Sequence, residues 1–138
     1  MEKFLNYQEI GLLETMRRTK GNMNTRKFGI IGEKIAQGYL KAKDYDILKT
    51  NFYTKRGEID IIAKKENCIV FVEVKTRSSL EYGIPAMAVD GLKKKHLKSS
   101  ASIYMYQNQL YKHNIRFDVI EIIIQGGKCK INHIEGIM

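Results

Sequence analysis

Several features are scarce or missing in this sequence, and three of these absences each exclude a class of protein. Its 138 residues include one proline, two cysteines and no tryptophan. A transmembrane helix is not expected, because no run of about 18 apolar residues occurs, and the N-terminus lacks the charged-then-apolar pattern of a secretory signal. Cys68 and Cys129 are too few for a disulfide framework and have no set of zinc ligands around them. We expect two free thiols in a cytoplasmic protein.

Acidic residues are also scarce relative to basic ones. The chain has 24 Lys and Arg against 15 Asp and Glu, which gives a formal net charge of +9. Net charge informs about partners and solubility rather than about fold. Nucleic acid is the commonest large polyanion for such a protein to bind, but a basic surface that contacts only water gives the same composition. The charge alone leaves both interpretations open.

The length of the chain fits one domain with one hydrophobic core. The first residues differ from the rest, because apolar positions in Phe4–Met16 allow a short amphipathic helix and a basic, turn-prone stretch follows it. We expect residues 1–22 to form an N-terminal extension that is either disordered or a dimer arm. Residues 23–138 are expected to form the folded domain.

Two helices are predicted from hydrophobic periodicity. The first spans residues 27–43, and its core face consists of Ile31, Ile35, Tyr39 and Ala42. The second spans residues 86–109, directly after Pro85, which suits the first turn of a helix. Its expected core-facing residues are Val89, Leu92, Leu97, Ala101, Tyr104 and Met105.

Five strands are predicted from runs of β-branched and aromatic residues. They cover residues 45–53, 58–63, 69–75, 116–124 and 128–134. Only Lys64–Cys68 separates the second strand from the third, so a hairpin is the natural connection between them. The order α-β-β-β-α-β-β predicts an α/β fold in which helices pack against a sheet.

Charged residues interrupt the two apolar strands of this hairpin. Side chains alternate between the faces of a strand, so Glu58 and Asp60 share a face, as do Glu73 and Lys75. Directly opposite residues of a hairpin also share a face. A turn over Lys65–Cys68 places Asp60 opposite Glu73 and Glu58 opposite Lys75. The sequence thus predicts three carboxylates and one ammonium group close together.

Like charges at such short range repel each other, and a divalent cation offsets this cost. Magnesium prefers hard oxygen ligands, and the expected ligands are the carboxylates of Asp60 and Glu73 with the Val74 backbone carbonyl, Glu58 being a further candidate. Lys75 is placed to orient a water molecule or to stabilise charge on a phosphate. The alternative is a solvated strand face on which one of the glutamates pairs with Lys75.

Two segments around these residues resemble a known family. They read Gly57-Glu58-Ile59-Asp60-Ile61-Ile62-Ala63 and Phe71-Val72-Glu73-Val74-Lys75-Thr76-Arg77. The pattern resembles the YraN-like family of predicted endonucleases, which is similar to archaeal Holliday junction resolvases and belongs to the PD-(D/E)xK nuclease superfamily. The resemblance extends from about Gly29 to Val119 and also includes Gly32-Glu33, Lys93 with Leu97, and Arg116-Phe117-Asp118-Val119.

The resemblance implies a restriction-endonuclease-like mixed sheet flanked by helices, in a nuclease-like domain over residues 23–138. It implies that Asp60 is the metal-binding acid, Glu73 the second acid and Lys75 the catalytic lysine. Glu33 matches a helix carboxylate that often completes such sites, whereas Ile59 stands where the superfamily commonly has proline. The implied activity is that of a magnesium- or manganese-dependent endonuclease acting on DNA, with branched or junction DNA as the implied substrate.

Basic residues that flank these acids are candidate nucleic-acid contacts, because Lys and Arg hold the phosphate backbone. The candidates are Lys55, Arg56, Arg77, Lys93 and Lys94. A solvated basic surface is the alternative interpretation for each of them. The histidines at 96, 113 and 133 are scattered and receive no predicted role.

Two further classes of function stay open from the sequence. One is a DNA-binding module that keeps the nuclease fold without cutting, although retained, mutually repelling carboxylates argue against it. The other is a nuclease-fold protein that acts on RNA or works only inside a complex, although DNA is favoured as the partner. No membrane partner is expected. A homodimer is expected for an enzyme that cuts both strands of a four-way junction, since a two-fold dimer matches that substrate.

Overall fold

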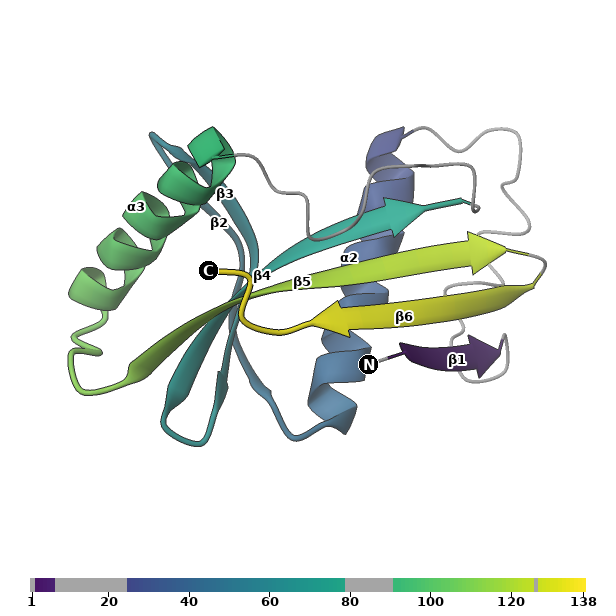
Figure 1. Cartoon of the computed structure of the whole chain (residues 1–138), viewed down its shortest axis with the longest axis horizontal. Coiled ribbons are helices and arrows are strands. Elements are labelled where there is room, and N and C mark those ends of the chain that lie inside the picture. Colours follow the sequence, from purple (N-terminus) through teal and green to yellow (C-terminus); the bar gives the residue numbers. More distant parts are fainter. Residues whose placement is uncertain (1, 7–24, 79–90, 126) are drawn as a thin grey trace.

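The structure is a computed structural model that describes residues 2–6, 25–78, 91–125 and 127–138 (Figure 1). These ranges contain the elements β1 (Glu2–Asn6), α2 (Thr25–Ala42), β2 (Asp46–Thr54), β3 (Gly57–Lys65), β4 (Cys68–Arg77), α3 (Gly91–Gln107), β5 (Asn114–Gln125) and β6 (Lys128–Ile134). From α2 to β6 the predicted order α-β-β-β-α-β-β is confirmed. The strand β1 precedes it.

The six described strands form one sheet in the order β1-β6-β5-β4-β3-β2. β4 and β5 run parallel, and the other neighbouring strands run antiparallel. A parallel pair needs a crossover connection, and α3 lies in the segment that connects β4 to β5. The predicted α/β fold with a mixed sheet is therefore confirmed.

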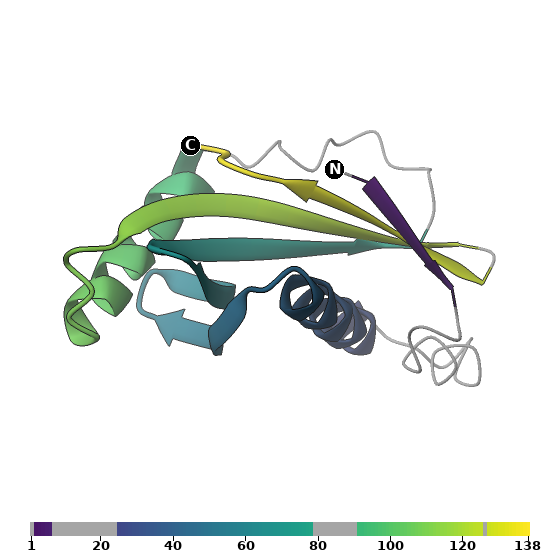
Figure 2. The same cartoon turned by 90° about the horizontal axis from the view of Figure 1, so that it is seen from below.

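The two helices cover opposite faces of the sheet, because successive residues of a buried strand point to opposite sides. In β4, Val70 and Val72 pack in the core beneath α2, whereas Ile69 and Phe71 pack in the core beneath α3. Figure 2 shows α2 below the central strands and α3 at one end of the sheet. Both faces of the hairpin are therefore apolar, and charged residues on it are unusual.

The predicted helix faces hold at most positions and are wrong at two. Ile35 and Tyr39 of α2 are buried, as are the α3 residues Leu97, Ala101, Tyr104 and Met105. Ala42 is exposed because it is the last residue of α2, where the helix leaves the sheet. Leu92 is 64% exposed. It precedes Leu97 by five residues, which is about 140° around a helix of 3.6 residues per turn. Val89 lies outside the described residues.

The N-terminal segment begins with a strand, although its sequence also allows a short helix. β1 pairs antiparallel with β6, from Glu2 opposite Asn132 to Asn6 opposite Lys128. The short helix that the sequence allows over Phe4–Met16 does not form at Phe4–Asn6, which belong to β1, and residues 7–16 lie outside the described residues. The outer edge of β6 offers unpaired backbone groups, and a neighbouring strand satisfies them.

The cysteines match their prediction, since both are free thiols. Cys129 is fully buried in the core beneath α2, and burial raises the pKa of its thiol to about 11. It therefore packs as a small apolar residue. Neither of the two described helices is long and apolar enough to cross a membrane.

Candidate metal centre

The hairpin of β3 and β4 opens into a fork at the predicted site. The two strands pair from Lys65 opposite Cys68 to Ile61 opposite Val72, which is the predicted register, and their pairing ends there. Beyond this point β3 stays paired with β2 and β4 stays paired with β5. Asp60 and Glu73 are thus the first residues beyond the paired segment, on strands that diverge in Figure 1. The expected cross-strand pairing of Asp60 with Glu73 and of Glu58 with Lys75 is therefore corrected.

Asp60 occupies the base of this fork. Its Oδ2 accepts a hydrogen bond of 2.8 Å from the backbone N–H of Val74, so a side chain takes the place of the missing strand pairing. Burial raises the pKa of Asp60 to about 7, against the lowering effect of the Val74 bond. The charges of Glu33, Glu73 and Glu58 raise the pKa further. Asp60 is therefore a carboxyl group whose negative charge lacks full compensation in the described structure.

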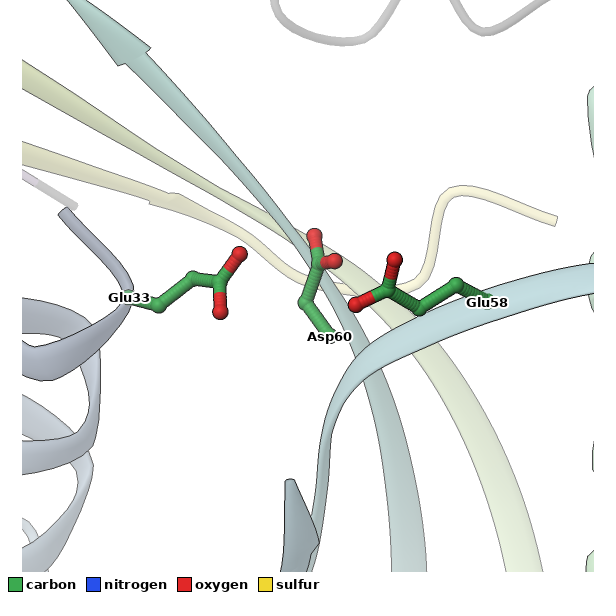
Figure 3. Close-up of side chains that lie close together, drawn as sticks. All are labelled: Glu33, Glu58 and Asp60. Atoms are coloured by element: carbon green, nitrogen blue, oxygen red, sulfur yellow. The ribbon is translucent and has the colours of Figure 1, made fainter. Parts of the chain in front are cut away.

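Two glutamates join Asp60 in a carboxylate cluster, defined here as Glu33, Glu58 and Asp60. One oxygen of each residue can be chosen such that all three lie within 4.8 Å of one another. Figure 3 shows Asp60 between Glu33, which comes from α2, and Glu58, which comes from β3. Burial raises the pKa of Glu33, a bond from Asn51 lowers it, and the charge of Glu58 raises it.

Close packing of α2 against β4 brings Glu33 to this position. A Cβ atom added at Gly32 would lie 1.8 Å from Thr76 Oγ1 and 2.8 Å from Thr76 Cβ, so any larger residue at 32 would push the helix away from the strand. Glu33 is the next residue along α2. The absence of a side chain at Gly32 therefore sets the distance between Glu33 and the sheet.

Asn51 of β2 is a member of the site that the sequence interpretation missed. Its Nδ2 donates to Glu33 Oε1 at 3.0 Å and to Glu58 Oε1 at 2.7 Å. A signal for it was present, because a tight turn over Thr54–Gly57 places Asn51 opposite Asp60. Asn51 does lie between the paired positions Thr50–Ile61 and Phe52–Ile59.

Glu73 lies outside the carboxylate cluster as defined among the described residues. It continues the face of β4 that carries Ile69 and Phe71, which is the face covered by α3. Accordingly, Glu73 Oε1 lies 3.4 Å from Nζ of Lys93 in α3. Glu73 nevertheless acts on the pKa of Asp60, so it is close enough to interact with that carboxyl group. Lys75 is part-buried on the same strand.

The candidate nucleic-acid contacts lie in three places, which are the turn between β2 and β3, the first turn of α3 and the end of β4. Lys55 and Arg56 are exposed in the turn between β2 and β3. This turn is next to α3, because Thr54 Oγ1 and Ser100 Oγ are 2.7 Å apart. Lys93 and Lys94 lie in the first turn of α3. Arg77 instead donates to Glu121 Oε2 at 2.8 Å in a mostly buried ion pair.

A second carboxylate, Asp118, is buried and is not a member of the carboxylate cluster. Arg116 donates to both of its oxygens, at 2.8 and 2.7 Å, and His133 Nε2 lies 2.7 Å from Oδ2. Gly136 N–H donates to Oδ1, and Tyr39 Oη lies 3.0 Å from His133 Nδ1. His133, which received no predicted role, is thus part of a buried polar network joining β5, β6 and α2.

The carboxylate cluster has the donor chemistry that a hard divalent cation requires. Magnesium and manganese favour carboxylate oxygens, and the charge of such an ion offsets the repulsion among Glu33, Glu58 and Asp60. The Val74 carbonyl and the Glu73 carboxylate belong to the strand that faces Asp60 across the fork. Two strands and one helix thus converge on a site that fits such a cation.

Comparisons with known proteins agree with this architecture. Residues 32–122 match the family described as "Uncharacterised protein family UPF0102". The chain is 45% identical to a UPF0102 protein from Syntrophomonas wolfei, over 79% of this chain and 95% of that protein. It is 46% identical to a UPF0102 protein from Clostridioides difficile, over 81% of this chain and 96% of that protein. The chain belongs to the UPF0102 family, which is the YraN-like group to which the sequence pattern pointed.

Proposed function

We propose that this chain is a metal-dependent endonuclease that hydrolyses phosphodiester bonds in DNA, and that branched DNA is its preferred substrate. The observation that carries the proposal is the carboxylate cluster at the fork, where Glu33, Glu58 and Asp60 converge without a cationic partner for Asp60 among the described residues. Perturbed carboxylates of this kind gather at functional sites. Membership of the YraN-like group supports the same interpretation.

The proposed roles of the chain's residues follow from their positions. Asp60, with Glu33 and Glu58, would hold a magnesium or manganese ion, and Glu73 and the Val74 carbonyl would complete its protein ligands from the other strand. Such an ion lowers the pKa of a bound water and neutralises charge on a phosphate. Lys75, two residues from Glu73 on the same strand, would orient the attacking water or stabilise negative charge on the phosphate.

The proposed path of the nucleic acid runs over the end of the molecule that carries α3. Lys93 contacts Glu73, so the first turn of α3 lies beside the site. Lys55 and Arg56 lie in the turn that Thr54 connects to α3 through Ser100. We propose that these residues and Lys94 contact phosphates. Arg77 is a weaker candidate for this role, because its guanidinium group already pairs with Glu121.

The decisive experiment is cleavage of a panel of labelled nucleic acids by the full chain, with magnesium or manganese present. The panel contains linear, nicked, flapped and four-way DNA, and a single-stranded and a hairpin RNA. We expect cleavage of DNA that requires the metal, is fastest on branched forms and is lost in Asp60→Ala. Binding without cleavage of any substrate, or cleavage confined to RNA, would contradict the proposal. Equal cleavage of all DNA forms would remove the preference for branches alone.

A further inference from the structure

The contact between Asn51 and two glutamates is the most specific interaction inside the carboxylate cluster. A single amide nitrogen lies 3.0 Å from Glu33 Oε1 and 2.7 Å from Glu58 Oε1, and these glutamates come from different elements, α2 and β3. Ionised carboxylates only accept hydrogen bonds, so the nitrogen of the amide, with its two hydrogens, must face them. Asn51 thus uses both donors of its amide on the two glutamates.

The backbone conformation at position 51 also favours asparagine. Its φ angle is 51°, in the left-handed region that few residues other than glycine adopt readily. Asparagine tolerates this region better than most residues. The position lies opposite Asp60 in the pairing of β2 with β3. Two properties of asparagine, its tolerance of left-handed backbone and its amide donors, therefore coincide at one residue beside the third carboxylate.

The two hydrogen bonds act on the glutamates in a way that favours a bound cation. Without an ion, the negative charges of Glu33 and Glu58 repel each other and that of Asp60. Asn51 holds each glutamate by Oε1 only, which leaves the second oxygen of each carboxylate available. Partners that orient metal ligands in this way contribute strongly to metal affinity, because the ligands need not be ordered when the ion binds.

We propose that Asn51 is a positioning residue, whose amide holds Glu33 and Glu58 in the arrangement that binds the catalytic cation. The inference rests on the proposed function and assigns to one residue the preorganisation of its metal site. In this role Asn51 acts through the two glutamates that it contacts.

The test compares two substitutions that separate the amide from the backbone. Asn51→Gly removes the amide and leaves the left-handed backbone unstrained, whereas Asn51→Ala removes the amide and also strains the backbone. Binding of Mn²⁺ to the full chain is measured by calorimetry, and folding is checked by circular dichroism and thermal unfolding. Asn67→Ala is the matched control, because Asn67 donates to Lys112 O from the exposed turn of the same hairpin, at the end away from the fork.

We expect both Asn51 variants to bind Mn²⁺ about 10- to 100-fold more weakly than the wild type and the control. Asn51→Gly should unfold at a higher temperature than Asn51→Ala. In cleavage assays, saturating Mn²⁺ should restore the rate of Asn51→Gly but not that of Asp60→Ala. Wild-type Mn²⁺ affinity in Asn51→Gly would overturn the inference and leave the proposed function intact. Absence of Mn²⁺ binding by the wild type would overturn both.

Discussion

Two aspartates, Asp60 and Asp118, are placed in the sheet with opposite electrostatic outcomes. Burial acts against the charge of each. At Asp118 the bonds from His133, Arg116 and Gly136 outweigh this effect, and the pKa of Asp118 is lowered. At Asp60 one backbone bond opposes burial while three carboxylates add repulsion, and the pKa rises to about 7. The same residue type is compensated at one position and uncompensated at the other.

The difference fits a structural role for Asp118 and the functional role proposed for Asp60. A buried charge that only supports the fold is expected to be paired, since an unpaired one is costly. Asp118 satisfies this expectation with an arginine, a histidine and a backbone N–H. Asp60 lies in a fork between two strands without a cationic partner among the described residues, and it is therefore a candidate for ligand binding.

The largest effect on stability is expected from removing Asp118, the aspartate whose buried charge is compensated. Asp118→Ala leaves Arg116 and His133 without their buried partner, and we expect the free energy of unfolding to fall by about 3–5 kcal/mol. Because the pKa of Asp118 is lowered on folding, its contribution is present above the ordinary pKa of aspartate and is lost as the pH falls through the lowered value. Urea unfolding measures both effects.

The control for this prediction is Glu135→Ala. Glu135 contacts the same arginine, with 3.3 Å between Glu135 Oε1 and Arg116 Nη1, but its side chain is 56% exposed. An exposed pair contributes less than about 1 kcal/mol. A comparable loss of unfolding free energy in both variants would show that the buried network stabilises the fold no more than the exposed pair does.

Breaking the uncompensated site should affect catalysis instead of folding. We expect Asp60→Ala, Glu73→Ala and Lys75→Ala each to reduce metal-dependent cleavage by about a hundredfold or more, because each removes a charge that acts in the transition state. Circular dichroism should remain that of the wild type. Wild-type cleavage by Glu73→Ala would refute its assignment, whereas Glu135→Ala serves as a surface control.

Only the Asp60 side of this contrast was accessible from the sequence, because the hairpin's pattern is local. Runs of β-branched and aromatic residues and a short turn predict β3, β4 and their register, which is confirmed from Lys65–Cys68 to Ile61–Val72, whereas the next expected pair, Asp60 with Glu73, is not formed. The fork was not predictable from alternation, which assumes a continuous ladder. At the fork, the Asp60 side chain accepts the hydrogen bond from the Val74 N–H in place of a strand backbone.

Interactions between distant segments were the part that the sequence concealed. The network of Asp118 joins residues up to 94 positions apart, Tyr39 and His133, and no periodicity relates them. The pairing of Glu73 with Lys93 depends on which face of the sheet α3 covers. The strand β1 was misjudged because a short apolar segment suits a helix or a strand, and the free edge of β6 decides between them.

An intermediate loss of activity is expected at the helix residue of the cluster. We expect Glu33→Ala to reduce cleavage by about tenfold, less than Asp60→Ala, because Glu33 reaches the site from α2 and assists in holding metal or water. Rates at several Mg²⁺ concentrations measure whether added metal compensates for the loss. A loss as large as that of Asp60→Ala would make Glu33 a primary ligand.

Substitution of Asp60 is expected to have a smaller effect on stability, opposite in sign to that of Asp118→Ala. The raised pKa of Asp60 means that the folded state binds more protons than the unfolded state between about pH 4 and pH 7, so stability falls as pH rises through this window. Asp60→Asn removes the charge and keeps an oxygen that accepts from Val74. Each pKa unit is worth about 1.4 kcal/mol, and we expect screening to leave a gain of about 1–2 kcal/mol at about pH 8.

This gain should disappear at about pH 5, where Asp60 is itself protonated. Unfolding is measured in chelator, because a bound cation would remove the repulsion that the substitution relieves. The charges that act on Asp60 are those of Glu33, Glu73 and Glu58. A pH-independent difference between the two proteins would contradict the raised pKa.

The smallest effect is expected on DNA binding by Lys93. This residue has two candidate partners, the Glu73 carboxylate and a DNA phosphate. Its Nζ is 3.4 Å from Glu73 Oε1, and its side chain is 44% exposed, so it can contact both the carboxylate and a passing phosphate. If it contacts DNA, Lys93→Ala should flatten the log-log dependence of binding on salt by about 0.9 for duplex DNA. Lys128→Ala is the control, because Lys128 is exposed at the start of β6, and this end of β6 lies on the opposite side of the molecule from α3 in Figure 1. An unchanged salt slope with altered Mn²⁺ affinity would assign Lys93 to Glu73 alone, and the phosphate path would then have to pass over Lys55 and Arg56 without the first turn of α3.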